Sequence, residues 1–259
     1  MKTFFHLRAA AALGLVLLAA ALPGWGQTLT LANWSIDVFS PSPTFGLADG
    51  NPRTPCFTNN GIAQSTLYAN CPLGAPLKLA AAGDGIFCTG QAVITGDVNA
   101  DGNLQFRFGL FFQGNHPADT NWLGYLFGNY VGNHEGAASA LMVRNNPNPG
   151  IYATGYPGNI MRPKCGQVAY TAGWTAGTYD FSLSITLLPG HAQKVDWQLS
   201  AAPPGTYNYS GTYTNTFALT EPPAFDQAGI MGGAALFNSP STTNTIRLNN
   251  VVVTLTRKK

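Results

Sequence analysis

One short segment carries the oxygen-bearing side chains of a calcium-binding loop. Asp97, Asn99 and Asp101 stand at the first, third and fifth positions of such a loop, and Gly102 stands at the sixth, where the chain must turn sharply. The twelfth position should hold a bidentate acid, but it is Phe108. We therefore interpret the segment as a β-turn built on Asp101 and Gly102, with a weak calcium site as the alternative. We expect the protein to need no cofactor.

Acid–base catalysis has few candidate residues in this chain. Glycoside hydrolases use two carboxylates across a cleft, and the only glutamates are Glu135 and Glu221, both in segments typical of loops or turns. A polysaccharide lyase needs a base beside a group that neutralises a carboxylate, and His134 with Arg107 offers those residue types. The alternative is that these two glutamates, the histidine and the arginine are ordinary polar groups of loops and solvated strand faces. No complete catalytic or metal-binding motif is present, so an enzyme is our secondary hypothesis.

Aromatic residues give a richer pattern. Flat rings stack on the apolar CH faces of sugars, while polar side chains bond the sugar hydroxyls. The alternative is core packing, and the alternating Tyr207, Tyr209 and Tyr213 fit that interpretation better. The residues that we predict to contact a ligand are Arg107, Trp122, Tyr125, Tyr130, Tyr152 and Tyr156.

The four cysteines predict two disulfides if the chain is exported. An even number of cysteines in an oxidising compartment is typical of disulfide bonding, and the spacing does not fit a zinc site. Three pairings are open. We favour Cys56–Cys71, which would close a loop rich in Pro and Asn, together with Cys88–Cys165.

The N-terminus has the three parts of a secretory signal peptide. Lys2 and Arg8 are basic, 9–22 is apolar, and small residues precede Gln27, so we expect residues 1–26 to be removed. The apolar run is too short to span roughly 30 Å of hydrocarbon. We therefore predict a secreted, periplasmic or cell-surface protein with no membrane insertion after cleavage.

The charge of the chain excludes some partners and favours others. Cleavage would leave eleven basic and eleven acidic residues, a balance that does not favour nucleic acid or anionic membranes. Charged residues make up 9% of the chain, whereas about 25% is usual in soluble domains. A surface made mostly of Asn, Thr, Ser, Gln and Gly suits a neutral, hydroxyl-rich partner such as an extracellular glycan or polysaccharide.

The elements that must position these residues are strands. Alternation with a period of two recurs, and Phe181, Leu183 and Ile185 share one strand face in a hairpin that turns at 188–191. A second hairpin is expected within 91–112, and a single N-terminal strand over 28–39. The whole chain has 48 glycines and prolines, and residues 27–259 show no helical period. We therefore expect residues 27–259 to form one all-β domain, an antiparallel, jelly-roll-like β-sandwich with almost no helix. The long connection 145–164 is either a functional loop or a plain surface loop.

Three stretches have a pattern shared with a known superfamily. They are Phe106 to Phe111 followed by Trp122 to Tyr125, Tyr179 to Leu183 leading into Val195 to Leu199, and Ile246 to Val253. In these stretches the chain resembles the concanavalin A-like lectin/glucanase superfamily of jelly rolls. The last stretch is similar to the closing strand of that group, which pairs with the N-terminal strand. The resemblance implies the fold more than the function, because this scaffold hosts lectins, hydrolases, lyases and inert modules.

Strand geometry places the predicted site. Phe106, Phe108 and Leu110 must face one way, so Arg107 faces the other, on the concave sheet. Trp122 or Tyr125 would follow on the next strand. We therefore expect an exported, lectin-like module that binds a neutral glycan. The alternatives are a polysaccharide lyase or glycoside hydrolase with an atypical site, and a structural or adhesive surface module.

The incomplete calcium loop makes a testable prediction. Because two carboxylates alone bind calcium weakly, the thermal unfolding temperature should change little between a chelator and millimolar calcium. Differential scanning fluorimetry measures this directly, and a rise of many degrees would identify the segment as a genuine calcium site.

Overall fold

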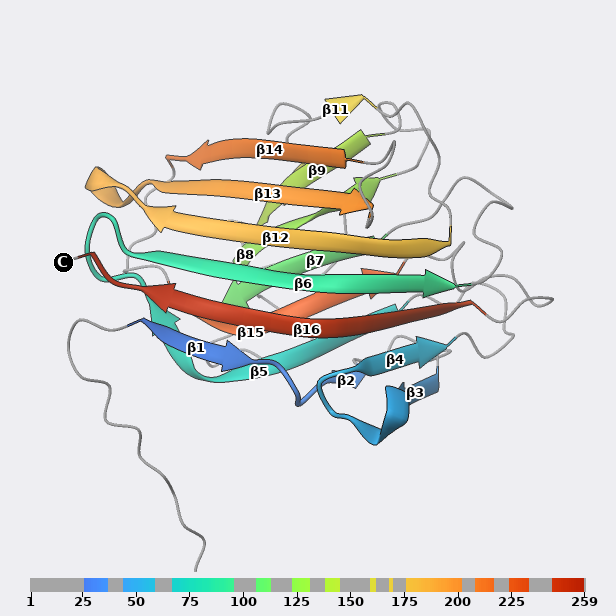
Figure 1. Ribbon diagram of the computed structural model, residues 1–259. Coiled ribbons are helices and arrows are strands. Elements are labelled where there is room, and N and C mark those ends of the chain that lie inside the picture. The colour runs from blue at the N-terminus through green and yellow to red at the C-terminus, as the bar shows by residue number, and fades with distance from the viewer. Residues whose placement is uncertain are drawn as a thin grey trace, which may run out of the picture.

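The computed structural model describes twelve stretches of the chain as two antiparallel β-sheets packed face to face (Figure 1). The described residues are 26–36, 44–58, 67–95, 106–112, 123–130, 138–144, 159–161, 168–169, 176–201, 208–216, 224–232 and 244–258. Among them, the helical elements are two short 3-10 turns, η1 (Ala48–Gly50) and η2 (Pro189–His191). No helix in the described stretches is long and apolar enough to cross a membrane. The predicted all-β antiparallel sandwich is confirmed.

The sheet in front in Figure 1, sheet A, contains both ends of the described chain. Its strands run in the order β14-β13-β12-β6-β16-β4-β3, and β1 also pairs with β16. Their bounds are β14 (Asn208–Asn215), β13 (Gln193–Ala201), β12 (Gly177–Leu187), β6 (Gly85–Thr95), β16 (Thr245–Thr256), β4 (Pro55–Thr58), β3 (Thr44–Leu47) and β1 (Gln27–Thr30).

Sheet B lies behind it, with the order β10-β9-β8-β7-β15-β5-β2 and β11 paired with β9. Its strands are β10 (Asn159–Met161), β9 (Ala138–Arg144), β8 (Leu123–Tyr130), β7 (Phe106–Phe112), β15 (Ala224–Gly232), β5 (Leu67–Lys78), β2 (Ser35–Ile36) and β11 (Val168–Ala169).

Aromatic rings from both sheets meet at the centre of the core. The ring centroid of Phe181 lies 4.6 Å from that of Phe108 and 5.9 Å from that of Phe106. Phe181 has room because its neighbour in register on β6 is Gly90, where a Cβ would lie 2.5 Å from the Phe181 ring. The packed layer between the sheets therefore fixes which face of each strand points inward.

The strand pairing confirms some expectations and corrects others. The hairpin of β12 and β13 is confirmed, and so is the pairing of the closing strand β16 with β1, in which Thr28 lies opposite Thr254. The expected hairpin within 91–112 is wrong, because β6 belongs to sheet A and β7 to sheet B. The expected strand over 28–39 is also wrong, since β1 joins sheet A and β2 joins sheet B. Alternation predicts the faces of a strand, but it does not predict its neighbours.

The structure contains neither of the favoured disulfides. Cys56, Cys71 and Cys88 are free thiols, and Cys165 lies outside the described residues. Cys71 and Cys88 belong to the core, whereas Cys56 neighbours the inward-facing Phe57 on β4 and so points to the other side of sheet A. Cys56 and Cys71 thus sit on different sheets with side chains aimed in different directions. Burial raises the pKa of the Cys71 and Cys88 thiols, so both behave as small apolar side chains.

A buried carboxylate fastens the C-terminal end of β16 to the turn before β6. Asp84 is 2% exposed and accepts hydrogen bonds from the backbone N–H groups of Ala80, Ala81 and Lys258 at 2.9–3.1 Å. The Arg257 guanidinium donates a further bond at 2.6 Å. Burial raises the pKa of the Asp84 carboxyl, but the hydrogen bonds from Ala80, Arg257, Lys258 and Ala81 together lower it by more, to about 2.

Replacing this carboxylate should reduce stability in a pH-dependent way. Because the folded-state pKa of Asp84 lies below the ordinary 3.8, its contribution is fully present above about pH 4 and is lost as the pH falls toward 2. Asp84→Asn should therefore lower the free energy of unfolding by about 2 kcal/mol at neutral pH. Urea unfolding of both proteins at several pH values measures this. If the difference between them did not shrink on acidification, the carboxylate would not be the fastening group.

Candidate functional site

The outer face of sheet A is polar because its inner face must be apolar. On β12, Phe181, Leu183 and Ile185 are buried in the core, and the alternating Ser182 and Ser184 point outward and are half-buried. The same alternation turns polar side chains outward on β13 and β14. Strand β6 differs in that one of its outward-facing residues is aromatic: Phe87 faces outward and is 46% exposed.

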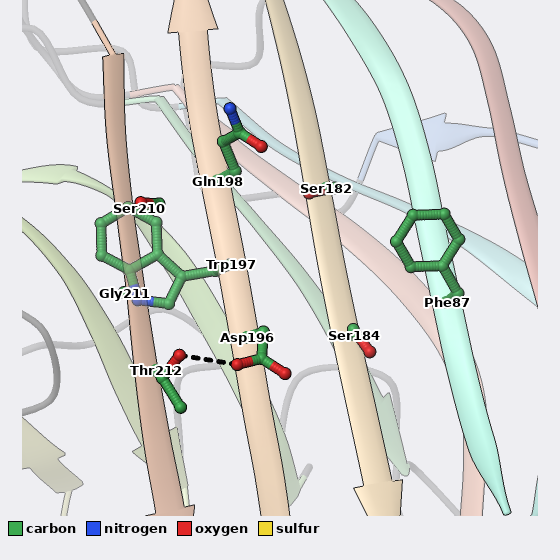
Figure 2. A pocket seen from close by; sticks show the side chains of 9 residues that line it. All are labelled: Phe87, Ser182, Ser184, Asp196, Trp197, Gln198, Ser210, Gly211 and Thr212. Carbon is green, nitrogen blue, oxygen red and sulfur yellow. Dashed lines mark hydrogen bonds between the residues drawn. The ribbon is translucent and has the colours of Figure 1, made fainter.

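A shallow hollow forms on this face because short side chains stand between longer ones. Ser184 lies in register with Phe87 on one side and with Asp196 on the other. Ser182 pairs in the same way with Gln198. The serines make the floor, Phe87 makes one wall, and the carboxylate and amide make the opposite wall (Figure 2). The hollow has a volume of about 270 Å³ and is open to solvent.

Strand β14 continues the polar wall. Thr212 donates a hydrogen bond of 2.6 Å from its hydroxyl to Asp196, drawn as the dashed line in Figure 2. Asp196 also pairs with the Lys194 ammonium at 3.0 Å, and Ser210 lies beside Gln198 in register. The carboxylate is therefore oriented by a neighbouring hydroxyl, and its charge is offset by a lysine of the same strand.

The core supports the hollow from behind. Trp197 lies between Asp196 and Gln198 in the chain, points inward and is 2% exposed. Its ring stacks on Phe127 of sheet B with centroids 5.9 Å apart and planes 18° apart. The wall residues on either side of Trp197 are thereby held on a strand that is anchored to the opposite sheet.

Arg107, predicted to contact a ligand, faces away from the inter-sheet core as alternation requires. Phe106, Phe108 and Leu110 belong to the core, and the register runs unbroken across Gly109, so no bulge changes the orientation. Arg107 is, however, only 1% exposed. Its side chain is buried on the outer side of sheet B and does not line an open groove there.

Tyr125 is not available to a ligand, which corrects the prediction made for it. It lies in register with Leu110 on the core side of β8 and is 2% exposed. Its hydroxyl donates to Gln193 Oε1 at 3.1 Å and accepts from Asn215 Nδ2 at 2.9 Å. Burial raises the pKa of the phenol, and the hydrogen bond from Asn215 offsets only part of that rise. Tyr125 thus joins sheet B to strands β13 and β14 of sheet A.

Most of the other predicted site residues lie outside the described stretches. Among the tyrosines favoured for the core, Tyr209 is buried there and Tyr213 packs against it, in agreement with that interpretation, and Tyr207 lies outside the described residues. The described part of the chain contains no group of three or more His, Cys, Asp and Glu that could hold a metal. Tyr130 ends β8, and its side chain is not described. The residues outside are Asp97, Asn99, Asp101, Trp122, His134, Glu135, Tyr152, Tyr156 and Glu221.

The hollow itself was missed by the sequence reasoning. The alternation of Ser182 and Ser184 with apolar residues identified their polar face, but nothing local marks it as a floor. The one local signal is Phe87, an aromatic residue between Ile86 and Cys88, which are both buried. An aromatic side chain on the polar face of an alternating strand would have indicated a contact surface.

Two solved lectins and a solved carbohydrate recognition domain have a similar fold. Lectin II from Ulex europaeus aligns with a TM-score of 0.53 at 12% identity, over 90% of this chain and 99% of that one. The acidic lectin of winged bean, solved with methyl-α-D-galactose, aligns with a TM-score of 0.55 at 10% identity, over 91% of this chain and 100% of that one. The carbohydrate recognition domain of Emp47p aligns with a TM-score of 0.52 at 10% identity, over 89% of this chain and 95% of that one. No protein-family model and no curated protein sequence matches the chain. At these identities the similarity establishes the fold, which is the concanavalin A-like lectin fold, as the sequence motifs indicated.

The placement of Tyr125 predicts a structural role for its hydroxyl. Tyr125→Phe should lower the free energy of unfolding by about 1–3 kcal/mol, because the buried Gln193 carbonyl loses a hydrogen-bond donor. Urea unfolding measures the change. An unchanged stability would contradict the assignment of Tyr125 as a polar tie between the sheets.

Proposed function

We propose that the protein is an exported carbohydrate-binding protein that recognises a neutral glycan in the hollow on the outer face of sheet A. The observation that carries the proposal is the exposed Phe87 ring, set across a serine floor from the carboxylate and amide of Asp196 and Gln198. A sugar-binding site needs an aromatic ring and hydrogen-bonding side chains, and here they lie on opposite sides of the hollow.

The chemistry of the hollow suits a pyranose ring. An aromatic face stacks on the apolar CH groups of a sugar and contributes about 0.5–1.5 kcal/mol beyond area burial. A carboxylate accepts from two neighbouring hydroxyls, and an amide both donates and accepts. Because Thr212 already orients Asp196, the acceptor is preorganised for the ligand.

Electrostatics favour a neutral ligand. The carboxylate in the hollow would repel an anionic glycan, and its pairing with Lys194 at 3.0 Å reduces the attraction for a cationic one. Few charges are available elsewhere, since charged residues make up 9% of the chain. Recognition must therefore rest on hydrogen bonds and ring stacking.

The fold supports carbohydrate binding in general. Two of the similar structures named above are lectins, one of them solved with a galactoside, and the third is a carbohydrate recognition domain. Export is supported by the signal-like residues 1–26. Free Cys71 and Cys88 are compatible with an oxidising compartment, because buried thiols with raised pKa values react slowly.

The aromatic site predicted from the sequence remains a separate hypothesis. It consists of Trp122, Tyr130, Tyr152 and Tyr156 together with Arg107, whose strand β7 belongs to sheet B and not to the sheet of the hollow. The catalytic alternative, a polysaccharide lyase or glycoside hydrolase, also depends mainly on residues outside the described stretches. Trp122→Ala and Phe87→Ala, compared in one binding assay, separate the two locations.

The first experiment asks whether the protein binds or cleaves. Purified protein without residues 1–26 is incubated with a panel of neutral and acidic polysaccharides, and both retention and new reducing or unsaturated ends are scored. We expect retention on a neutral polysaccharide without new ends. New ends would establish an enzyme, and the absence of any retention would contradict the proposed function.

The second experiment locates the site. Phe87→Ala should weaken retention on the neutral polysaccharide about tenfold, because the loss of stacking and of buried ring area removes on the order of 1–2 kcal/mol. Leu47→Ala is the matched control, since Leu47 is a similarly exposed apolar residue of sheet A, 40% exposed, on the distant strand β3. Equal retention by Phe87→Ala and Leu47→Ala at wild-type strength would exclude the hollow as the binding site.

A further inference from the structure

The hollow is the middle of a longer polar surface that crosses the strands. Two cross-strand rows pass through it, and each continues beyond β6 onto β16 and β1. The first row, called here the Phe87 row, consists of Thr28, Thr254, Phe87, Ser184, Asp196 and Thr212. The second, the Thr89 row, consists of Thr30, Val252, Thr89, Ser182, Gln198 and Ser210.

The two rows are in register from one end to the other. Each is a continuous series of directly opposed residues over β1, β16, β6, β12, β13 and β14. Five inter-strand steps of about 4.8 Å give a length of roughly 24 Å, and the rows lie roughly 7 Å apart. All twelve side chains are exposed or half-buried. The rows therefore form a narrow accessible track, far longer than a single sugar.

The chemistry of the track is uniform. Eight of its twelve residues carry hydroxyl groups, and Asp196 is its one charged residue, paired with Lys194. At the end away from the hollow, the hydroxyls of Thr28 and Thr254 lie 3.3 Å apart and can bond together to one ligand hydroxyl. A surface of this kind complements a repeating, uncharged ligand rich in hydroxyl groups.

We infer that the ligand is a linear neutral polysaccharide bound lengthwise, with its chain running across the strands from β14 to β1. The inference rests on the proposed function and deepens it. One sugar occupies the hollow against Phe87, and the following sugars lie over Thr89, Thr254 and Thr28. Affinity therefore grows with chain length, unlike that of a site that holds only a terminal sugar.

A pair of threonine variants tests the far end of the track. Thr28→Val with Thr254→Val removes both hydroxyls and keeps the β-branched shape that suits a strand. The matched control is Thr95→Val with Thr245→Val, which removes the equivalent cross-strand pair, 2.5 Å apart, outside the track on the same face. Thermal unfolding verifies that both double variants are folded.

Each protein is titrated calorimetrically with the disaccharide and the hexasaccharide of the cello-, laminari-, malto-, manno- and xylo- series. Wild type should bind the hexasaccharide of one series about tenfold or more tightly than its disaccharide, since the longer chain makes several additional hydrogen bonds. The Thr28/Thr254 variant should lose most of that gain and keep the disaccharide affinity, while the Thr95/Thr245 variant behaves as wild type.

The outcomes separate the two proposals. Equal affinity of wild type for disaccharide and hexasaccharide, or a hexasaccharide affinity unchanged in the Thr28/Thr254 variant, overturns the lengthwise track and leaves the hollow as a small-sugar site. Binding to no oligosaccharide of any series overturns both the track and the proposed function.

Discussion

The packed layer between the two sheets constrains every other feature of this protein. Phe181, Phe108 and Trp197 can reach across it only if each strand keeps its apolar residues on one face. The period of two then sends the intervening residues, such as Ser182 and Gln198, to the outer face of sheet A. The polar surface is thus a direct consequence of the core. Phe87 is the exception, because burial cannot account for an aromatic ring at an outward position.

The sequence predicts strand faces well and strand neighbours poorly. The shared inward face of Phe106, Phe108 and Leu110 follows from alternation, and the hairpin of β12 and β13 follows from a local turn; both are confirmed. The hairpin expected within 91–112 fails because β6 pairs with β12 and β16, which are distant in the sequence. Long-range pairing depends on which complete set of strands packs best, and no local pattern contains that information.

The candidate site escaped prediction for the same reason. Its floor, walls and far end come from strands that meet only in the folded sheet, so Phe87 and Thr254 become neighbours of Ser184 only through pairing. Tyr125 illustrates the converse error. A tyrosine suits both a sugar and a core, and only the buried partners Gln193 and Asn215 decide between them. The type of a residue therefore indicates which roles it could have, and the strand register shows which of them it has.

A neutral glycan on the outer face of sheet A would contact the threonine side chains of that face. NMR spectra of protein labelled at the threonine methyl groups, recorded while the hexasaccharide that binds best is added, detect this contact. We expect shifts at the methyls of Thr89, Thr212 and Thr254, with the methyls of Thr95 and Thr245 unchanged. Saturating hexasaccharide that left the methyls of Thr89, Thr212 and Thr254 unchanged would exclude the outer face of sheet A as the binding site.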